Sequence, residues 1–438
     1  MLLYFIRRVA RSHFWRSTAC GASTNLRAML LAAIFSVLFA CSASAAMAGS
    51  KNTEAAVPLA SQGIEAYDGG DYAAATTDLK QAQAIAPDNS AIALYLGLAN
   101  LKQGNLSTAI AAWDKYIALK PSTEIERTNN LQDTVTRDLT ILLREQNHQE
   151  AETQIANERD IGPPDPDAVA ITYYQNLGSP ALTALQKGLT ALVIADVSKV
   201  PNLKVVERDR MQALLDEMKL GSSGLADPRT AARAGHLLGA SRVVTGSYLD
   251  PQQGQMRIDS TLLQTGALSS ASNQTASGSI VHFYDVEERL SAKILEDLGY
   301  SESELKARGL WQAVQTPQTT NYDAFIAFSR GLDAKDKQDY AEARKFFKQA
   351  LVDDPSFVLA LQELDRTPLQ EASLADVASS VGAQAPGAAA VTASLLGGAS
   401  VGAVSNLPPI AITTIPPVPP PPPPPPVVVP PLNPSFPN

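Results

Sequence analysis

The stretch LKVVERDRMQALLDEM, Leu203 to Met218, decides the fold that we predict for the middle of this chain. An alternating apolar run reaches four consecutive charges, Glu207 to Arg210, and apolar residues then recur at helical spacing, which predicts a strand leading into a helix. We predict that Asp209 caps this helix, which would begin near Arg210, because a carboxylate there accepts hydrogen bonds from free N–H groups. Glu207 and Arg208 are expected to pair locally and fix the turn, a structural role rather than a catalytic one.

The sequence on either side predicts strands that alternate with helices and then a meander. Strand patterns occur in AVAITYY, SRVVTGSYL, QMRIDSTLLQT and ALSSASNQTASGS, and helical patterns follow Leu182, Asp227 and Val286. Asp227 is a candidate N-cap, with Pro228 at the first helical position and Gly239 at the C-terminal end. We therefore predict a layered α/β domain over residues 165–300.

A regular repeat precedes this domain. Its copies are GIEAYDGGDYAAATTDLKQAQAIAP (63–87) and GLANLKQGNLSTAIAAWDKYIALKP (97–121), and a third copy, GLDAKDKQDYAEARKFFKQALVDDP, follows at 331–355. The pattern resembles the tetratricopeptide repeat (TPR), a unit of two antiparallel helices. The small residues should let the two helices approach closely, and each proline should end the second helix. The positions expected to serve packing are Gly63, Ala75, Pro87, Gly97, Ala109, Pro121, Gly331, Ala343 and Pro355.

These copies predict two all-α segments. Residues 56–160 should hold the first two repeats and a capping helix, because apolar residues at Leu131, Val135, Leu139 and Leu142 keep helical spacing. Residues 320–366 should hold the third repeat with its own capping helix. A protein partner is expected to bind through the repeats.

The segment 1–40 is typical of a secretory signal. Five arginines precede the apolar run MLLAAIFSVLFA, which is short for a membrane span and is followed by small residues, although a retained anchor is the alternative. LFAC, ending at Cys41, resembles a bacterial lipobox, so we predict lipid attachment at Cys41 and association with the outer membrane. Cleavage after Ala45 or Ala48 by ordinary signal peptidase is the competing prediction.

The C-terminal end has an unusual composition. Charged residues are absent after Asp376, and eight consecutive prolines, 419–426, favour polyproline II. We predict that residues 377–438 form a disordered Ala/Gly/Pro-rich tail, which is either inert or a ligand for a proline-binding module.

Composition and motifs argue against several classes of function. Without residues 1–40 the chain has 30 basic and 44 acidic residues, a net charge of −14, which argues against a nucleic-acid partner. The histidines His148, His236 and His282 lack the spacing of a helical zinc pair, and phosphate-binding and nucleophile-elbow motifs are missing. Glu287–Glu288 and Asp353–Asp354 are expected to be solvated rather than to form an acid/base pair. We therefore predict no catalytic, cofactor-binding or metal-binding residue, and a protein that is not an enzyme.

Residues 189–249 resemble the curli production assembly/transport (CsgG-like) family. The resemblance rests on Val206-Glu207-Arg208, the helices that follow, Val244-Thr245-Gly246-Ser247 and the later QTG at 264–266, and it extends over about 168–299. It implies that Glu207, Arg208, Asp209, Gly246 and Ser247 are structural signatures of the fold. It also implies a periplasmic α/β domain at the outer membrane, often in a lipoprotein.

Together these patterns predict a non-enzymatic adapter or assembly protein of the cell envelope, located in the periplasm and associated with the outer membrane. Its repeats would bind a protein and its CsgG-like domain would act at the outer membrane, in the assembly of curli-like or other surface structures. A homo-oligomer is compatible with this prediction. The alternatives are a component of a CsgG-type secretion channel and, less favoured, an enzyme that acts on the cell wall.

Overall fold

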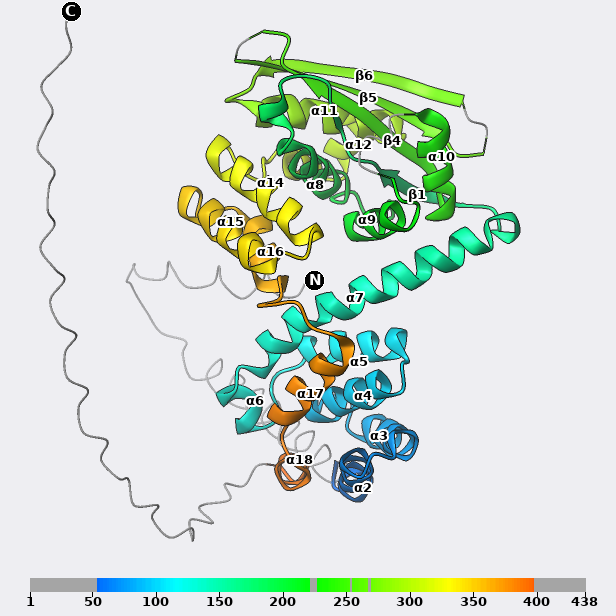
Figure 1. The fold of residues 1–438 in the computed structure, drawn as a ribbon, viewed down its shortest axis with the longest axis vertical. Helices are drawn as coiled ribbons and strands as arrows, with labels where there is room; N and C mark the ends of the chain where they lie inside the picture. The colour runs from blue at the N-terminus through cyan, green and yellow to red at the C-terminus, as the bar shows by residue number, and fades with distance from the viewer. Residues whose placement is uncertain (1–52, 221–226, 253, 267–268, 398–438) are drawn as a thin grey trace, which may run out of the picture. The chain divides into compact units, whose positions relative to one another are not determined.

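The computed structural model describes residues 53–220, 227–252, 254–266 and 269–397 (Figure 1). The predicted signal, Cys41 and the proline run lie outside the described residues. Among the described residues, no helix combines the length and the apolar character needed to cross a membrane.

The first two repeats form the helical hairpins α2 (Ala56–Asp68) with α3 (Tyr72–Ile85), and α4 (Ser90–Lys102) with α5 (Leu106–Ala118). In each hairpin a glycine of the first helix faces a large side chain of the second helix. A Cβ on Gly63 would lie 2.7 Å from Leu79, and a Cβ on Gly97 would lie 2.0 Å from the Trp113 ring. The glycines therefore permit a helix contact that a larger residue would prevent.

A single long helix follows the repeats. After α6 (Glu124–Thr128), α7 (Leu131–Ala156) runs for 26 residues. Its N-terminal half buries apolar residues in the core of the two hairpins, and Ala151 near its other end is buried in a core of the α/β part. The helix thus contributes to two separate cores.

The α/β part is built on a mixed sheet. Its strands are β1 (Asp165–Ile171), β2 (Gln175–Asn176), β3 (Lys204–Val205), β4 (Ala240–Leu249), β5 (Gln255–Gln264) and β6 (Ser269–Ser279). The order across the sheet is β3-β1-β4-β5-β6, with β2 paired to β4. Pairings among β1 to β4 are parallel, whereas β4-β5-β6 is an antiparallel meander.

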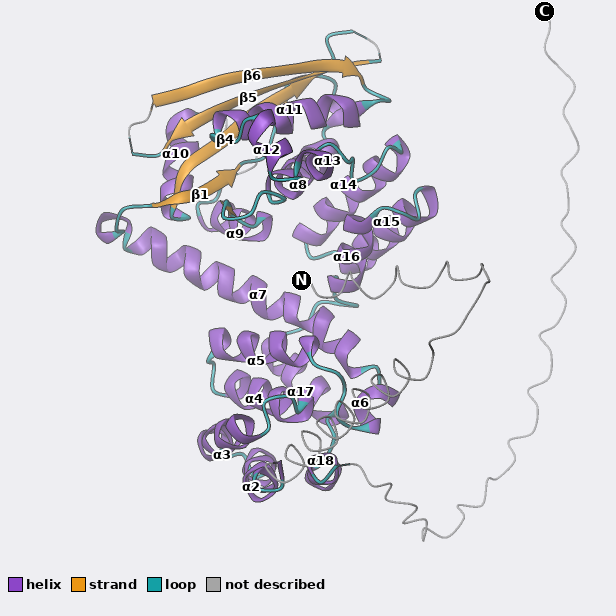
Figure 2. Cartoon of the chain, turned by 180° about the vertical axis from the view of Figure 1, so that it is seen from behind, coloured by secondary structure: helices purple, strands orange, loops and turns teal. Residues whose placement is uncertain are grey.

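Helices cover both faces of this sheet near β1 and β4 (Figure 2). On one face lie α8 (Leu185–Val197) and α11 (Phe283–Asp297), which share an apolar core with β4 and β5. On the other face lie α9 (Arg208–Glu217) and α10 (Pro228–Leu237), and α10 is capped by Asp227 as predicted. Alternate residues of β1 supply the two cores, because successive side chains of a strand point to opposite faces.

The third repeat also forms a hairpin, α14 (Tyr322–Asp336) with α15 (Tyr340–Asp353), followed by α16 (Val358–Arg366). Two short helices, α12 (Glu302–Ala307) and α13 (Trp311–Val314), connect it to α11. A Cβ on Gly331 would lie 2.5 Å from the Phe347 ring, which repeats the contact of the first two copies. This hairpin packs on α8 and belongs to the same apolar core as the sheet.

The predicted disordered tail is wrong for its first part. Residues that we expected to be disordered from 377 onward instead form most of α17 (Leu374–Gln384) and all of α18 (Ala388–Leu395). Ser373 and Asp376 form a capping box at the start of α17, and Val377, Val381, Val391 and Leu395 are buried in the core of the first two hairpins. The Ala-rich composition lowered the apparent amphipathicity, but the apolar spacing is that of a helix with one buried face.

Candidate functional site

The four-charge run lies where three helical segments meet, and its local structure differs from the prediction. Helix α9 begins at Arg208 rather than near Arg210, and Glu207 occupies the N-cap position without a side-chain cap bond. Asp209 therefore does not cap the helix. Its carboxylate instead lies 2.5 Å from Nη2 of Arg208 and 3.2 Å from Nζ of Lys335 on α14. The full charges of the adjacent Arg208 and of Lys335 have replaced the weaker N–H partners of a cap.

Arg208 is the centre of a buried ion pair. Its side chain is 8% exposed, and its Nη1 donates to both carboxylate oxygens of Asp336, at 2.9 and 2.7 Å, and to the Tyr173 hydroxyl at 3.1 Å. Lys187 of α8 lies 2.7 Å from the same Asp336. The expected local pairing is found for Arg208, whose Nη2 lies 2.5 Å from the adjacent Asp209, but the pairing with Asp336, 128 residues away in the sequence, was not predicted.

Lys335 forms the second half of this network. Its Nζ lies 2.8 Å from Oε2 of Glu363 on α16 and 3.2 Å from Asp209. Burial alone would lower the pKa of Lys335, but the carboxylates of Asp209 and Glu363 outweigh it and raise the pKa above its usual value. Burial likewise opposes ionisation of Asp209, but Lys335 and Arg208 hold its pKa below the usual range. The Asp209 side chain is 43% exposed, so solvent screens its pairing more than that of Arg208 with Asp336.

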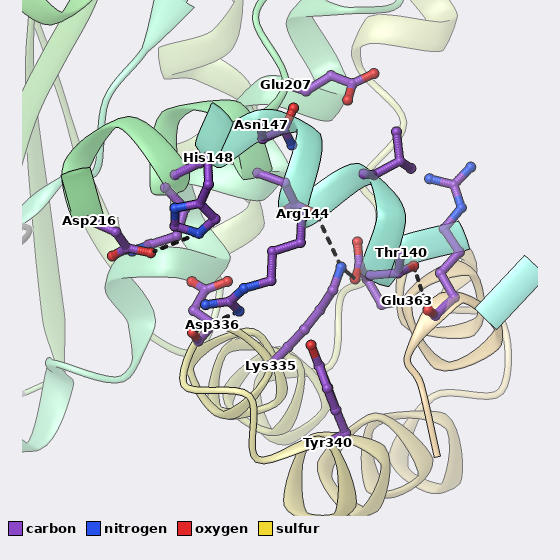
Figure 3. Close-up of a pocket in the computed structure, with 15 residues that line it drawn as sticks. Thr140, Arg144, Asn147, His148, Glu207, Asp216, Lys335, Asp336, Tyr340 and Glu363 are labelled. Carbon is purple, nitrogen blue, oxygen red and sulfur yellow. Dashed lines mark hydrogen bonds and ion pairs between the residues drawn. The ribbon is translucent and has the colours of Figure 1, made fainter. Parts of the chain in front are cut away.

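A cavity of about 100 Å³ lies beside this network, between α7, α9 and the α14–α16 segment (Figure 3). Figure 3 shows Arg144 of α7 and Lys335 of α14 directed into the same space. Arg144 donates to the backbone oxygen of Asp336 at 3.4 Å, and Thr140 donates to the backbone oxygen of Arg366 at 2.7 Å. The helix α7 is therefore bonded to the C-terminal ends of α14 and α16.

His148 closes the other side of the cavity. Its Nδ1 lies 2.8 Å from Glu217 and its Nε2 lies 3.9 Å from Asp216, both on α9. In the part of the chain that the structure describes, no group of three or more His, Cys, Asp or Glu residues has the arrangement of a metal site. Arg208 pairs with Asp336, Lys335 with Asp209, and His148 with Glu217. These contacts join α7, α9 and α14 and fix their spacing.

A buried carboxyl pair on the opposite side of α8 was missed by the sequence analysis. Glu287, expected to be solvated, is 2% exposed and receives a hydrogen bond of 2.6 Å from Ser291. Burial, and then the neighbouring Asp196 carboxylate, raise the pKa of Glu287 well above its usual value. Lys199 lies 2.6 Å from Asp196 and partly compensates its charge. The signal was present in the sequence, because Glu287 falls on the apolar stripe of Phe283, Leu290 and Ile294.

The predicted packing residues of the repeats lie at equivalent places in their hairpins. Ala75, Ala109 and Ala343 are fully buried, each at the first turn of the second helix. The prolines follow the second helices, which end at Ile85, Ala118 and Asp353. Where the first two copies place Gly70 and Gly104 at positive φ, the third has Gln338, at φ 62°.

The remaining signature residues lie on β4. A Cβ on Gly246 would lie 2.3 Å from the backbone oxygen of Asp259 and 2.5 Å from the Tyr174 ring, so a larger residue would displace one of them. Ser247 pairs with Gln175 of β2 on one side and with Asp259 of β5 on the other. Both residues therefore contribute to the packing and pairing of the sheet, and neither belongs to the charged network around Arg208.

Two family models match separate parts of this chain. Residues 149–251 match the family model described as curli production assembly/transport component CsgG, and residues 61–123 match a tetratricopeptide repeat model. Among solved structures, the C-terminal domain of LpoB from Salmonella enterica is similar at 10% sequence identity, over 30% of this chain and 94% of that chain, with a TM-score of 0.23. The search of curated proteins found no match. The CsgG match begins in the second half of α7 and ends just after β4, and the repeat match ends before α7. The helix α7, which is buried in the cores of both parts, joins the two matched segments.

Proposed function

We propose that this protein is a non-enzymatic adapter of the bacterial envelope, in which the repeats bind a protein and the CsgG-like domain acts in the assembly of a surface structure. The continuity of α7 carries the proposal. One helix is buried at one end among the repeat hairpins and at the other end against the CsgG-like sheet. A partner held by the repeats would therefore have a fixed position relative to the α/β domain.

The charged network supports the same role. Arg208, Asp336 and Lys335 connect the start of α9 to the third hairpin, Arg144 connects that hairpin to α7, and His148 connects α7 to the end of α9. Ion pairs that are buried and hydrogen-bonded on every side resist rearrangement, since removing one partner leaves a charge without compensation. Such a junction suits a scaffold that keeps two binding modules at a constant distance.

Attachment to the outer membrane is part of the proposal and rests on the sequence around Cys41. Lipidation with several acyl chains would anchor the protein firmly. Expression of Cys41→Ala, or treatment with globomycin, should release the protein from the membrane fraction or block its processing. A soluble mature protein that begins at Ala46 or Gly49 would exclude the anchor but not the adapter role.

The adapter role is tested by affinity capture from an envelope extract, with quantitative mass spectrometry. The wild-type protein should enrich a protein that the Gly97→Val variant does not, because the added side chain would collide with Trp113 and distort the second hairpin. Ala111→Leu, on the exposed face of α5, is the matched control and should capture the same protein as the wild type. Equal capture by wild type and Gly97→Val would contradict binding through the repeats.

A further inference from the structure

The C-terminal helices α17 and α18 cover one side of the repeat hairpins. Helix α18 packs on α2, and α17 packs on α4 and α7 (Figures 1 and 2). As a consequence α4 is buried along its length, from Ser90 to Leu101, between its neighbouring repeat helices and α17. The chain thus places a segment of its own, from beyond the whole α/β part, on the face formed by α2 and α4.

The contact itself is apolar and free of charge pairs among the described residues. Val377, Ala378 and Val381 of α17, and Val391 and Leu395 of α18, supply the buried side chains. The hairpins do not depend on this segment for their internal contacts, since Gly63 with Leu79 and Gly97 with Trp113 lie within each repeat. Small apolar side chains on a helix face without charge make a contact that other helices of similar pattern could also make.

Two of the polar groups around this segment bond to backbone oxygens at the end of α17. The Tyr95 hydroxyl donates to the backbone oxygen of Pro386 at 3.0 Å, and Asn129 donates to the backbone oxygen of Gln384 at 3.2 Å. Gln384 is the last residue of α17, where carbonyl groups lack intrahelical partners. A third donor, Asn89, bonds to the Ser394 hydroxyl at 2.9 Å. Any chain with a helix that ends just before a proline would offer carbonyl groups to Tyr95 and Asn129.

We propose that residues 373–397 are a replaceable occupant of the α2–α4 face, and that the partner bound there presents an Ala/Val-rich helix whose buried face carries no charge and which ends shortly before a proline. This proposal rests on the protein-binding role proposed above and specifies the partner for it. Only the short stretch 367–373 connects α16 to α17. Because so short a connection keeps the segment at a high effective concentration, on the order of millimolar, it would reduce the apparent affinity of a competing partner.

The test uses a fluorescent synthetic peptide with the sequence of residues 373–397 and the purified full chain. The double substitution Val377→Asp and Val381→Asp should release the segment and raise the affinity for the peptide at least tenfold over the wild type. Ser379→Asp with Ser380→Asp adds the same charge on the exposed face of α17 and should bind the peptide as the wild type does. Adding Tyr95→Phe and Asn129→Ala to the released variant should weaken peptide binding, which nonspecific apolar adsorption would not predict.

Two outcomes would overturn the proposal. If the released variant does not bind the peptide, or loses more helix content by circular dichroism than the residues of α17 and α18 account for, then α17 and α18 are a permanent part of the core. If light scattering shows a wild-type dimer that becomes a monomer in the released variant, then the segment belongs to a second copy of the chain. The peptide experiment needs no envelope partner, so it can succeed or fail independently of the capture experiment.

Discussion

The first two hairpins and the third share their internal contacts but differ in what surrounds them. In all three, a glycine of the first helix faces a large residue of the second, and an alanine is buried at the start of the second helix. The first two form a core with α7, α17 and α18, whereas the third is part of the core of the CsgG-like sheet. The residues that the copies share therefore determine the packing of the two helices within a hairpin. The outer-face residues, which differ between copies, determine what the hairpin packs against.

The largest expected effect is at the contact that embeds the third hairpin. Phe325 is fully buried and stacks on Phe283 of α11, with ring centroids 4.2 Å apart. Phe325→Ala should destabilise the α/β part by roughly 3–5 kcal/mol, because it leaves a cavity between α14 and α11. Hydrogen exchange should accelerate in α8 and α11 and remain unchanged in α4. Val352→Ala, on the exposed face of α15, is the control, and faster exchange confined to α14 and α15 would show that the third hairpin is independent.

The next effect is at the ion pair between α9 and the third hairpin. Asp336→Asn should cost roughly 3 kcal/mol in denaturant unfolding, because it removes the buried carboxylate whose two oxygens accept from Nη1 of Arg208. Asp333→Asn, on the same helix with a side chain that is 40% exposed, should cost far less. Arg208→Met combined with Asp336→Leu should recover much of the loss. Equal costs for the two asparagine variants would mean that the pair does not hold the hairpin in place.

Larger side chains at the buried alanines compare how tightly the two helices pack in the second and third hairpins. Ala109→Leu and Ala343→Leu should each cost roughly 1–3 kcal/mol, because both positions are fully buried between paired helices. The loss for Ala109→Leu should appear in the melting of the repeat part, and that for Ala343→Leu in the melting of the α/β part. Ala111→Leu is the surface control. A melting temperature of Ala109→Leu equal to that of the wild type would show that the predicted repeat register is wrong.

A smaller effect is expected at the turn of the third hairpin. Gln338 adopts a left-handed conformation that the first two copies assign to glycine. Gln338→Gly should stabilise the third hairpin by up to about 1 kcal/mol, because the strain that it removes exceeds the added flexibility of the unfolded chain. The reverse change, Gly104→Gln, should destabilise the second hairpin. A lower melting temperature for Gln338→Gly would indicate that the glutamine side chain stabilises the turn.

The smallest expected effect is a dependence of the stability on pH, over a range that differs between the α/β part and the repeat part. Burial, with Asp196 and Asp285 nearby, raises the pKa of Glu288 to about 7, whereas burial raises the pKa of Asp138 on α7 to about 6. A carboxyl with a raised pKa holds its proton in the folded state, so its stabilising contribution is complete below its unfolded pKa and is lost as the pH rises through the folded value. Stability of the α/β part should therefore decrease between about pH 4.5 and pH 7. Glu288→Gln should reduce the difference in melting temperature between pH 5 and pH 8, and an unchanged difference would exclude this group as its source.

Much of the fold was predictable because it depends on local patterns. The regular spacing of the repeats, the hairpin signal between β4 and β5, and the Asp227 cap each lie within a short stretch of sequence. The CsgG-like and repeat segments were recognisable for the same reason, although the matched CsgG residues extend only to 251. Local rules of propensity and spacing suffice for such elements.

The candidate site was less predictable because its contacts are distant in the sequence. The charges of Glu207 to Arg210 were visible, but a single sequence does not show that Arg208 meets Asp336 or that Lys335 attracts Asp209 away from a capping role. The helix α17 was missed for a different reason. Its capping box at Ser373 and its apolar pair at Val377 and Val381 were visible, but the Ala/Gly/Ser-rich composition favoured disorder.

The uninterrupted helix α7 has a geometric consequence for the evolution of this protein. With a rise of about 1.5 Å and a rotation of about 100° per residue, its 26 residues span about 39 Å. An insertion of one residue between Leu142 and Ala151 would turn the α/β part by about 100° about the helix axis relative to the repeats, and would separate Arg144 from Asp336. An insertion of about seven residues would nearly restore the angle while lengthening the helix by about 10 Å. Changes in the length of this helix should therefore be tolerated, if at all, in steps of whole turns.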